Sequence, residues 1–220
     1  MVHHHRLLKV VLSAFAVIAL VNLILLHTHS SVRTAAICRI SVLGDSLTAA
    51  YGIAWEEGFP AQLVAALTNA GYPCDVIDAG VSGDTTAGGL ARLGWVLADR
   101  PTHVIIELGA NDGLRGLPTD QMEANLDAIV ARLKGEDIAV FLTGMLPPPN
   151  LGRDYTEAFS RVYQDLADRH AIPLYPFFLD GVAGNPALNQ PDQLHPLPEG
   201  IIVIVKRILP HIIDWLDASI

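Results

Sequence analysis

A serine stands where an apolar segment gives way to a turn, in the sequence Gly44-Asp45-Ser46-Leu47. The preceding run, residues 37–43, is apolar enough to be a buried strand, and open α/β sheets bind ligands beyond the carboxyl ends of their strands. A hydroxyl at such a strand end becomes a nucleophile when a base removes its proton. A serine in this position can equally be the N-cap of a helix, so the interpretation of Ser46 depends on its partners.

The partners that a nucleophilic serine requires occur further along the chain. His195 can act as the base and Asp192 can orient it, since a spacing of three lets one short turn supply both side chains. Asn111 offers an amide donor and Gly83 an unobstructed backbone N–H, which together with the N–H of Ser46 could bind an oxyanion. These residue types therefore predict hydrolysis through an acyl-enzyme.

Each of these partners also has a structural interpretation. Asp192 and His195 could form a capping pair or half of a metal site, although no further His or Cys lies at ligand spacing nearby. Asn111 could be a turn former, and Gly83 could serve only to permit a positive φ. The occurrence of all of them in this order, each after an apolar run, favours the catalytic interpretation.

Apolar residues near these polar segments are candidates for substrate binding. Three consecutive prolines, at positions 147–149, predict a stiff loop that could form one wall of a cleft. The residues that could line an acyl groove are Leu114, Leu117, Met145, Leu146 and Pro147. Ordinary packing in the core or in loops is the alternative for this set.

Strands and helices alternate along the part of the chain that must position these residues. Strand-length apolar runs are expected at residues 37–43, 74–79, 103–108, 138–143 and 172–175, and helices at 58–71, 85–99, 119–134, 154–170 and 197–216. This alternation predicts an α/β domain with a mostly parallel sheet covered by helices on both faces. The polar segments then converge at the carboxyl edge of that sheet.

The order of the motifs resembles that of the SGNH, or GDSL, hydrolases over about residues 37 to 215. The blocks are Gly-Asp-Ser-Leu, Ser-Gly-Asp-Thr-Thr, Gly-x-Asn-Asp-Gly-Leu-Arg-Gly and Asp-x-x-His. The bacterial arylesterase, thioesterase I and lysophospholipase branch is the most similar. The resemblance implies a nucleophile at Ser46, oxyanion-hole residues at Gly83 and Asn111, and a triad completed by Asp192 and His195. It also implies a flavodoxin-like three-layer sandwich of strand order 2-1-3-4-5, without a metal or organic cofactor.

Two positions depart from the pattern of that family. Ala110 stands where a second glycine is frequent, which adds only a methyl group. Leu197 follows His195-Pro196 where a polar residue is common, which should alter the capping of the last helix and leave the triad alone.

The N-terminal segment, residues 1–36, has the layout of an export signal. A basic stretch precedes residues 10–26, which are almost wholly apolar. A cleaved signal peptide and a retained membrane anchor both suit this length. We therefore expect an exported protein, in the bacterial periplasm, secreted, or anchored to the inner membrane, with residues 37–220 as a single catalytic domain.

Charge and cysteine content restrict the partners of that domain. Removing Arg6, Lys9 and Arg33 from the 14 basic residues leaves 11 against 23 acidic ones, a net charge of −12 that disfavours nucleic acid. Cys38 and Cys74 each lie six residues before a glycine that ends an expected strand, so a disulfide is possible. Two unlinked, buried residues are the favoured interpretation, because neighbouring parallel strands seldom offer bridging geometry.

These observations predict a serine esterase that acts on a small carboxylic ester or thioester. Aryl esters and short-to-medium acyl esters are favoured, with acyl thioesters or lysophospholipids as further substrates. The alternatives are a carbohydrate O-acetylesterase, against which the aromatic content of 6% weighs slightly, and a non-catalytic flavodoxin-like binding domain. A monomer is expected, without nucleic-acid partners, and with membrane contact only through an uncleaved N-terminal segment.

Overall fold

The computed structural model describes residues 38–219, and the proposed export segment, residues 1–36, lies outside them. Five strands form one parallel sheet of order β2-β1-β3-β4-β5, as the family resemblance implied. The strands are β1 (Arg39–Gly44), β2 (Asp75–Gly80), β3 (His103–Glu107), β4 (Ala139–Thr143) and β5 (Leu174–Tyr175). Gly44 pairs with Gly80 at the carboxyl ends of β1 and β2, so the loops that follow them begin side by side.

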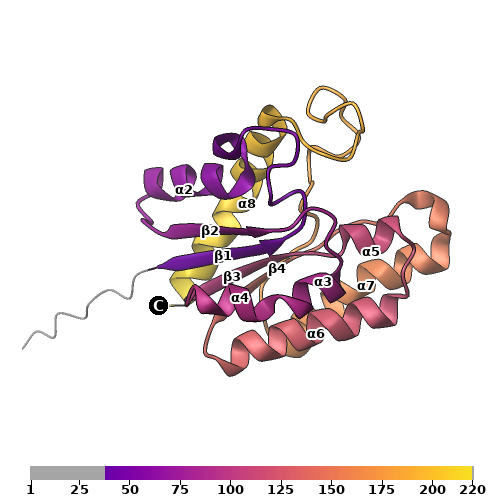
Figure 1. The fold of residues 1–220 in the computed structure, drawn as a ribbon, viewed down its shortest axis with the longest axis horizontal. Coiled ribbons are helices and arrows are strands. Elements are labelled where there is room, and N and C mark those ends of the chain that lie inside the picture. The colour runs from indigo at the N-terminus through magenta and orange to yellow at the C-terminus, as the bar shows by residue number, and fades with distance from the viewer. Residues whose placement is uncertain (1–37, 220) are drawn as a thin grey trace, which may run out of the picture. The chain divides into compact units, whose positions relative to one another are not determined.

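Helices cover both faces of this sheet (Figure 1). The helix α2 packs against α8 on one face, while α6 packs against α3 and α7 on the other. The helices are α2 (Phe59–Asn69), α3 (Thr86–Ala91), α4 (Leu93–Ala98), α5 (Ala110–Leu114), α6 (Thr119–Gly135), α7 (Arg153–His170) and α8 (Pro198–Ala218), with 3₁₀ turns at Trp55–Glu57 and Pro149–Leu151. Within residues 38–219 no helix is both long and apolar enough to cross a membrane.

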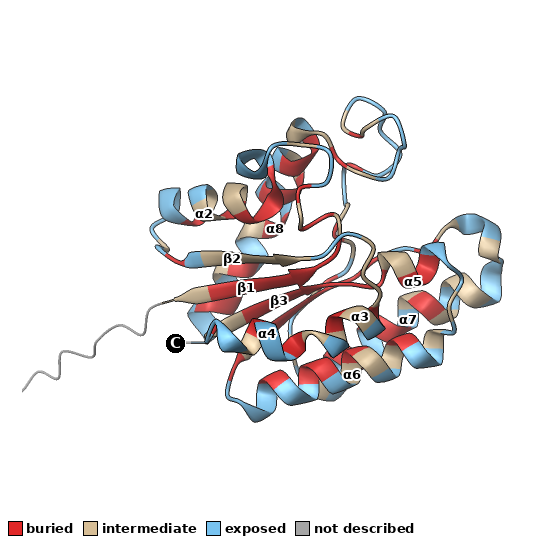
Figure 2. Cartoon of the chain, viewed as in Figure 1, coloured by how far each residue is buried: buried red, intermediate tan, exposed pale blue. Residues whose placement is uncertain are grey.

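Burial follows the pattern expected of a sheet between two helical layers. The central strands β1, β3 and β4 are almost entirely buried, and the helices bury one face each (Figure 2). The α7 helix buries Phe159, Val162, Tyr163 and Leu166, at the spacing of one helical stripe. The buried central strands fix the positions of their carboxyl ends, and the loops that follow these ends carry the candidate site residues.

One expected helix, 85–99, is two helices in the structure. The break falls at Arg92, whose backbone leaves the helical region with φ −101° and ψ 7°. The Arg92 side chain turns toward the strand ends, where it binds Asp84 and the carbonyl of Gly44. Gly88 and Gly89 weaken the helix just before the break. A tertiary contact therefore overrides the continuous helix that the sequence pattern predicts.

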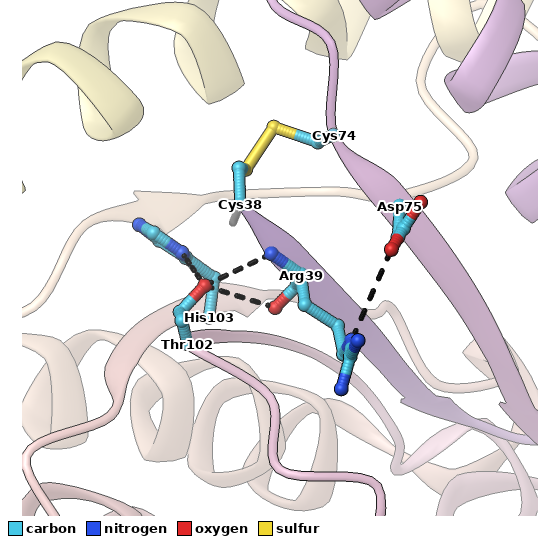
Figure 3. Close-up of a disulfide and its surroundings, with 6 residues drawn as sticks. All are labelled: Cys38, Arg39, Cys74, Asp75, Thr102 and His103. Carbon is cyan, nitrogen blue, oxygen red and sulfur yellow. Dashed lines mark hydrogen bonds and ion pairs between the residues drawn. A yellow bond between two sulfur atoms is a disulfide. The ribbon is translucent and has the colours of Figure 1, made fainter. Parts of the chain in front are cut away.

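A disulfide joins Cys38 to Cys74 (Figure 3), so the interpretation of two unlinked cysteines is wrong. Their Cα atoms lie 4.6 Å apart, within the range that a disulfide spans. Both residues directly precede the first paired positions of β1 and β2, where Arg39 faces Asp75. The two cysteines therefore lie opposite each other at the amino ends of the two strands, and the amide of Asp75 donates to the Cys38 carbonyl at 2.9 Å.

The start of α8 agrees with the expectation for Leu197. Leu197 is the N-cap and makes no side-chain capping hydrogen bond, while Pro198 occupies the first turn, where its missing N–H costs nothing. The amide of Leu197 instead donates to the carbonyl of Leu188 at 2.9 Å. This backbone contact ties the start of α8 to the preceding loop, which carries His195.

Candidate active site

The tight turn after β1 presents Ser46 at the carboxyl edge of the sheet. The Asp45 side chain accepts the amide of Leu47 at 3.0 Å, and the Asp45 carbonyl accepts the amide of Ala49 at 3.0 Å. Gly44 is required by close approach, because a Cβ there would lie 2.0 Å from the hydroxyl of Thr48. The turn leaves Ser46 half-buried and facing a cavity.

Ser46 is linked to His195 and Asp192 by a continuous chain of hydrogen bonds. The Ser46 Oγ lies 2.9 Å from His195 Nε2, and His195 Nδ1 lies 2.7 Å from Asp192 Oδ2. The bond from His195 is the largest cause that lowers the pKa of Asp192 to about 2, and the amides of Leu194 and His195 lower it further. An ionised carboxylate can only accept a hydrogen bond, so His195 Nδ1 is the donor to Asp192. In the neutral imidazole the other nitrogen, Nε2, then carries no hydrogen and can accept the hydrogen bond of the Ser46 hydroxyl.

The loop that carries His195 is clamped to the loop after β1. Gln190 donates its backbone N–H to the His195 carbonyl at 2.7 Å and its side-chain amide to the Tyr51 carbonyl at 2.7 Å. The Tyr51 ring lies over the imidazole of His195, with 4.5 Å between ring centroids. Gln193, inside the turn, has a φ of 59°, an uncommon conformation for a residue other than glycine. These contacts place the His195 imidazole against Ser46, which lies 149 positions earlier in the sequence.

The two expected oxyanion donors line the same cavity as Ser46. Gly83 lies in the loop between β2 and α3 with a φ of 85°, so the glycine is needed for its backbone conformation. Asn111 lies in the first turn of α5, a short helix that the sequence pattern did not predict. Gly109 begins this helix with a φ of 117°, and a Cβ there would lie 2.1 Å from the Tyr163 hydroxyl.

Hydrogen bonds brace the loops that carry these donors. Arg92 and Asp84, both largely buried, form an ion pair of 2.5 Å next to Gly83, and Arg92 also donates to the Gly44 carbonyl at 2.8 Å. On the other side, Asp112 accepts the amide of Thr86 at 2.8 Å and its hydroxyl at 2.7 Å. The loops after β1, β2 and β3 are thereby held together as one unit.

The cavity beside Ser46 has a volume of about 660 Å³. The expected residues Leu114, Met145, Leu146 and Pro147 line it. Leu117 is not among its lining residues; it lies in the turn after α5, where its carbonyl accepts the Tyr155 hydroxyl at 2.8 Å. Sequence reasoning missed further lining residues that come from other loops, namely Tyr51, Phe177, Leu179, Ala183 and Leu194.

Two buried carboxyl groups meet at the serine turn: Asp45 belongs to the turn, and Glu107 accepts hydrogen bonds from its Asp45 amide and its Thr48 hydroxyl. Burial raises the pKa of Asp45 to about 6, although the Leu47 amide and the Asn111 side chain oppose this rise. Burial also raises the pKa of Glu107 well above its usual value, and the neighbouring Asp45 adds to the effect. Glu107 is a charged residue at the end of an otherwise apolar strand, which is the signal that could have marked it in the sequence. Within residues 38–219, no group of His, Cys, Asp and Glu side chains could hold a metal ion.

A parallel sheet of order 2-1-3-4-5, with a Ser–His–Asp chain and a largely apolar cavity at its carboxyl edge, defines a serine hydrolase of the flavodoxin-like α/β class. Residues 42–201 match the GDSL-like Lipase/Acylhydrolase family. The chain belongs to this family.

Individual relatives narrow the activity. The chain is 43% identical over 175 residues to esterase TesA of Pseudomonas aeruginosa, covering 79% of this chain and 85% of that protein. It is 40% identical over 200 residues to an arylesterase of Vibrio mimicus (90% and 100% covered). It is 37% identical over 185 residues to thioesterase 1/protease 1/lysophospholipase L1 of Escherichia coli (84% of each). The crystal structure of the psychrotrophic esterase EstA from Pseudoalteromonas, inhibited by monoethylphosphonate, superposes with a TM-score of 0.78 at 37% identity (81% and 98%). The protein is a carboxylic ester hydrolase.

Proposed function

We propose that Ser46 is the nucleophile of this esterase and that His195 and Asp192 activate it. The observation that carries the proposal is the unbroken chain from Ser46 Oγ through the imidazole to the Asp192 carboxylate, with distances of 2.9 and 2.7 Å. A serine that only capped a helix would not need a histidine fixed in one tautomer by an ionised carboxylate.

In the acylation step, Ser46 Oγ attacks the carbonyl carbon of the ester while His195 Nε2 takes the hydroxyl proton. Negative charge develops on the carbonyl oxygen, which then accepts hydrogen bonds from the amides of Ser46 and Gly83 and from the Asn111 side chain. The imidazolium, stabilised by Asp192, donates its proton to the leaving oxygen or sulfur as the carbonyl re-forms.

In the deacylation step, a water molecule attacks the acyl-enzyme while His195 takes one of its protons. The second tetrahedral intermediate uses the same oxyanion donors, and His195 returns the proton to Ser46 Oγ as the acid departs. All protons remain on the substrate, the water, Ser46 and His195, so the cycle needs no other reactant.

The cavity supports apolar acyl or aryl groups as the preferred substrates. Its lining includes Leu114, Met145, Leu146 and Pro147, together with Tyr51 and Leu194. Aryl esters and short-to-medium acyl esters suit such a surface, and thioesters or lysophospholipids present the same kind of chain. The activities named for the relatives agree with this range. A carbohydrate ester would instead be expected to select a more polar and aromatic lining.

We further propose that the protein is exported and works in an oxidising compartment. The basic and apolar layout of residues 1–36 supports export. The disulfide between Cys38 and Cys74 supports it independently, because such bonds are rare in a reducing cytosol. Fractionation of the producing cell tests this location, and recovery in the cytosol with an intact N-terminus would contradict it.

The nucleophile is tested with p-nitrophenyl esters of graded acyl length and with a fluorophosphonate probe. We expect the wild-type protein to hydrolyse the esters and to be labelled at Ser46, and we expect Ser46→Ala to lose both properties while melting at the same temperature. Ser82→Ala is the matched control, because Ser82 also lines the cavity, whereas the serine hydroxyl hydrogen-bonded to His195 is that of Ser46. Hydrolysis by Ser46→Ala at the wild-type rate would overturn the assignment.

A further inference from the structure

Asp45 and Glu107 are two fully buried carboxyl groups to which the proposed reaction assigns no role. Both side chains are 0% exposed. The Oε2 atom of Glu107 accepts the backbone N–H of Asp45 at 3.2 Å and the hydroxyl of Thr48 at 2.9 Å. Burying two neighbouring carboxyl groups costs folding free energy. A contribution of this pair to the reaction would offset the loss of stability.

Asp45 connects this pair to the oxyanion hole. Its Oδ2 accepts a hydrogen bond from Asn111 Nδ2 at 2.9 Å, while its Oδ1 accepts the Leu47 amide. An Asn amide nitrogen carries two hydrogens. When Asp45 holds one of them, the amide cannot exchange its oxygen and nitrogen without losing this bond. The second hydrogen is then available to a group bound in the cavity that Asn111 lines with Ser46.

Two neighbouring carboxyl groups that are both buried cannot both be ionised without a large electrostatic cost. Both oxygens of Asp45 accept N–H donors, which favours its ionised form. The Oε1 atom of Glu107 is buried and has no hydrogen-bond partner among the described residues, so it is the oxygen free to carry a proton. Burial and the neighbouring Asp45 carboxylate both raise the pKa of Glu107, which agrees with a proton on this residue.

We propose that Asp45 is a positioning residue that orients the Asn111 amide toward the oxyanion, and that Glu107 lies beneath it as a neutral acid that leaves Asp45 ionised. This inference rests on the proposed function, in which Asn111 donates to the oxyanion. Asp45 acts through Asn111 and does not touch the substrate itself.

The near-isosteric change Asp45→Asn tests the proposal. An amide at position 45 has one acceptor oxygen, which cannot serve both Leu47 and Asn111, so Asn111 flips and its N–H leaves the oxyanion. We expect a ~10–10²-fold fall in kcat with KM nearly unchanged, since the lost bond forms only in the transition state. Asp78→Asn is the matched control, because among residues 38–219 the one hydrogen bond that the Asp78 side chain accepts comes from the amide of Gly80 on its own strand.

A double-mutant cycle with Asn111→Ala separates positioning from a general structural defect. Asn111→Ala alone should lower kcat by ~10²–10³. If Asp45 acts through Asn111, adding Asp45→Asn to Asn111→Ala slows the enzyme by no more than about twofold, the scatter expected between independent sites. Thermal melting of each variant verifies that it is folded.

The outcomes distinguish this inference from the proposed function. Single effects that multiply in the double variant would overturn the positioning role while leaving Asn111 as an oxyanion donor. Full kcat in Asn111→Ala would overturn the oxyanion role itself, and the positioning role with it. We also expect Glu107→Gln, which mimics a protonated acid, to reduce kcat less than Asp45→Asn does. The reverse order would overturn the assignment of the proton to Glu107.

Discussion

Removing the disulfide should destabilise the domain strongly without changing its chemistry. The perturbation is the double variant Cys38→Ala and Cys74→Ala, in which neither thiol remains. The two cysteines are separated by 36 positions, and closing a loop of that length restricts the unfolded chain by about 3.8 kcal/mol at 25 °C. In a domain of this size each kcal/mol corresponds to ~2–4 °C, so the Tm should fall by roughly 8–15 °C.

The kcat of this variant should equal that of the wild-type enzyme at a temperature where both are folded. The disulfide precedes β1, whereas Ser46 follows it, and the six residues of that strand span roughly 20 Å. The rigid central sheet between them does not depend on the bond for its register, because β1 also pairs with β3.

Scanning calorimetry of the oxidised wild-type protein, the dithiothreitol-reduced protein and the double variant measures this effect. The last two should melt together. A loss in Tm of less than ~3 °C, with no free thiol detected in the oxidised wild-type protein, would refute the loop-entropy argument. Two reactive thiols in that protein would refute the bond itself.

Three further predictions concern buried and paired charges. Glu107→Gln should be as stable as the wild type near pH 4 and increasingly more stable as the pH rises, by up to ~1.4 kcal/mol per pH unit. The reason is that Glu107 ionises in the unfolded chain but keeps its proton in the folded protein until its raised pKa is reached. A difference in unfolding free energy that stays constant from pH 4 to 6 in urea would contradict this. Arg92→Met should cost about 3–5 kcal/mol by leaving Asp84 buried and unpaired. Adding Asp84→Asn should recover part of that loss in the same unfolding assay. Asp192→Asn should lower kcat by ~10²–10⁴. The upper figure applies to a buried triad carboxylate, and because Asp192 is exposed the fall should be smaller than that. A fall in kcat of less than tenfold would contradict its role.

The sequence predicted the features that depend on local pattern and on chemistry. The alternation of apolar runs and helices predicted a parallel sheet and the segments that meet at its carboxyl edge, and the family resemblance implied the strand order. Ser46, Asp192 and His195 could be selected because a serine after a buried strand together with an Asp-x-x-His turn has few roles other than nucleophilic catalysis. The structure brings all three side chains together.

Features that depend on long-range contacts could not be predicted in the same way. The break at Arg92 arises from its contact with Gly44, 48 residues away, which no helical pattern records. Leu117 was assigned to the cavity from its sequence neighbours, but the turn after α5 directs its segment toward Tyr155. The pairing of Cys38 with Cys74 depends on which residue first enters the ladder, a detail finer than the expected strand boundaries.

The large sequence separation between Ser46 and His195, the two residues of the proposed nucleophile–base pair, has a consequence for biosynthesis. Ser46 and His195 are 149 residues apart, and the histidine is held in place by Gln190, which reaches back to Tyr51. If Ser46 and His195 act as proposed, a growing polypeptide that still lacks this later loop possesses the serine but has no base to activate it. Hydrolytic activity would then appear only after the loop with His195 has been made, so a shorter product could not consume esters or thioesters where it is made.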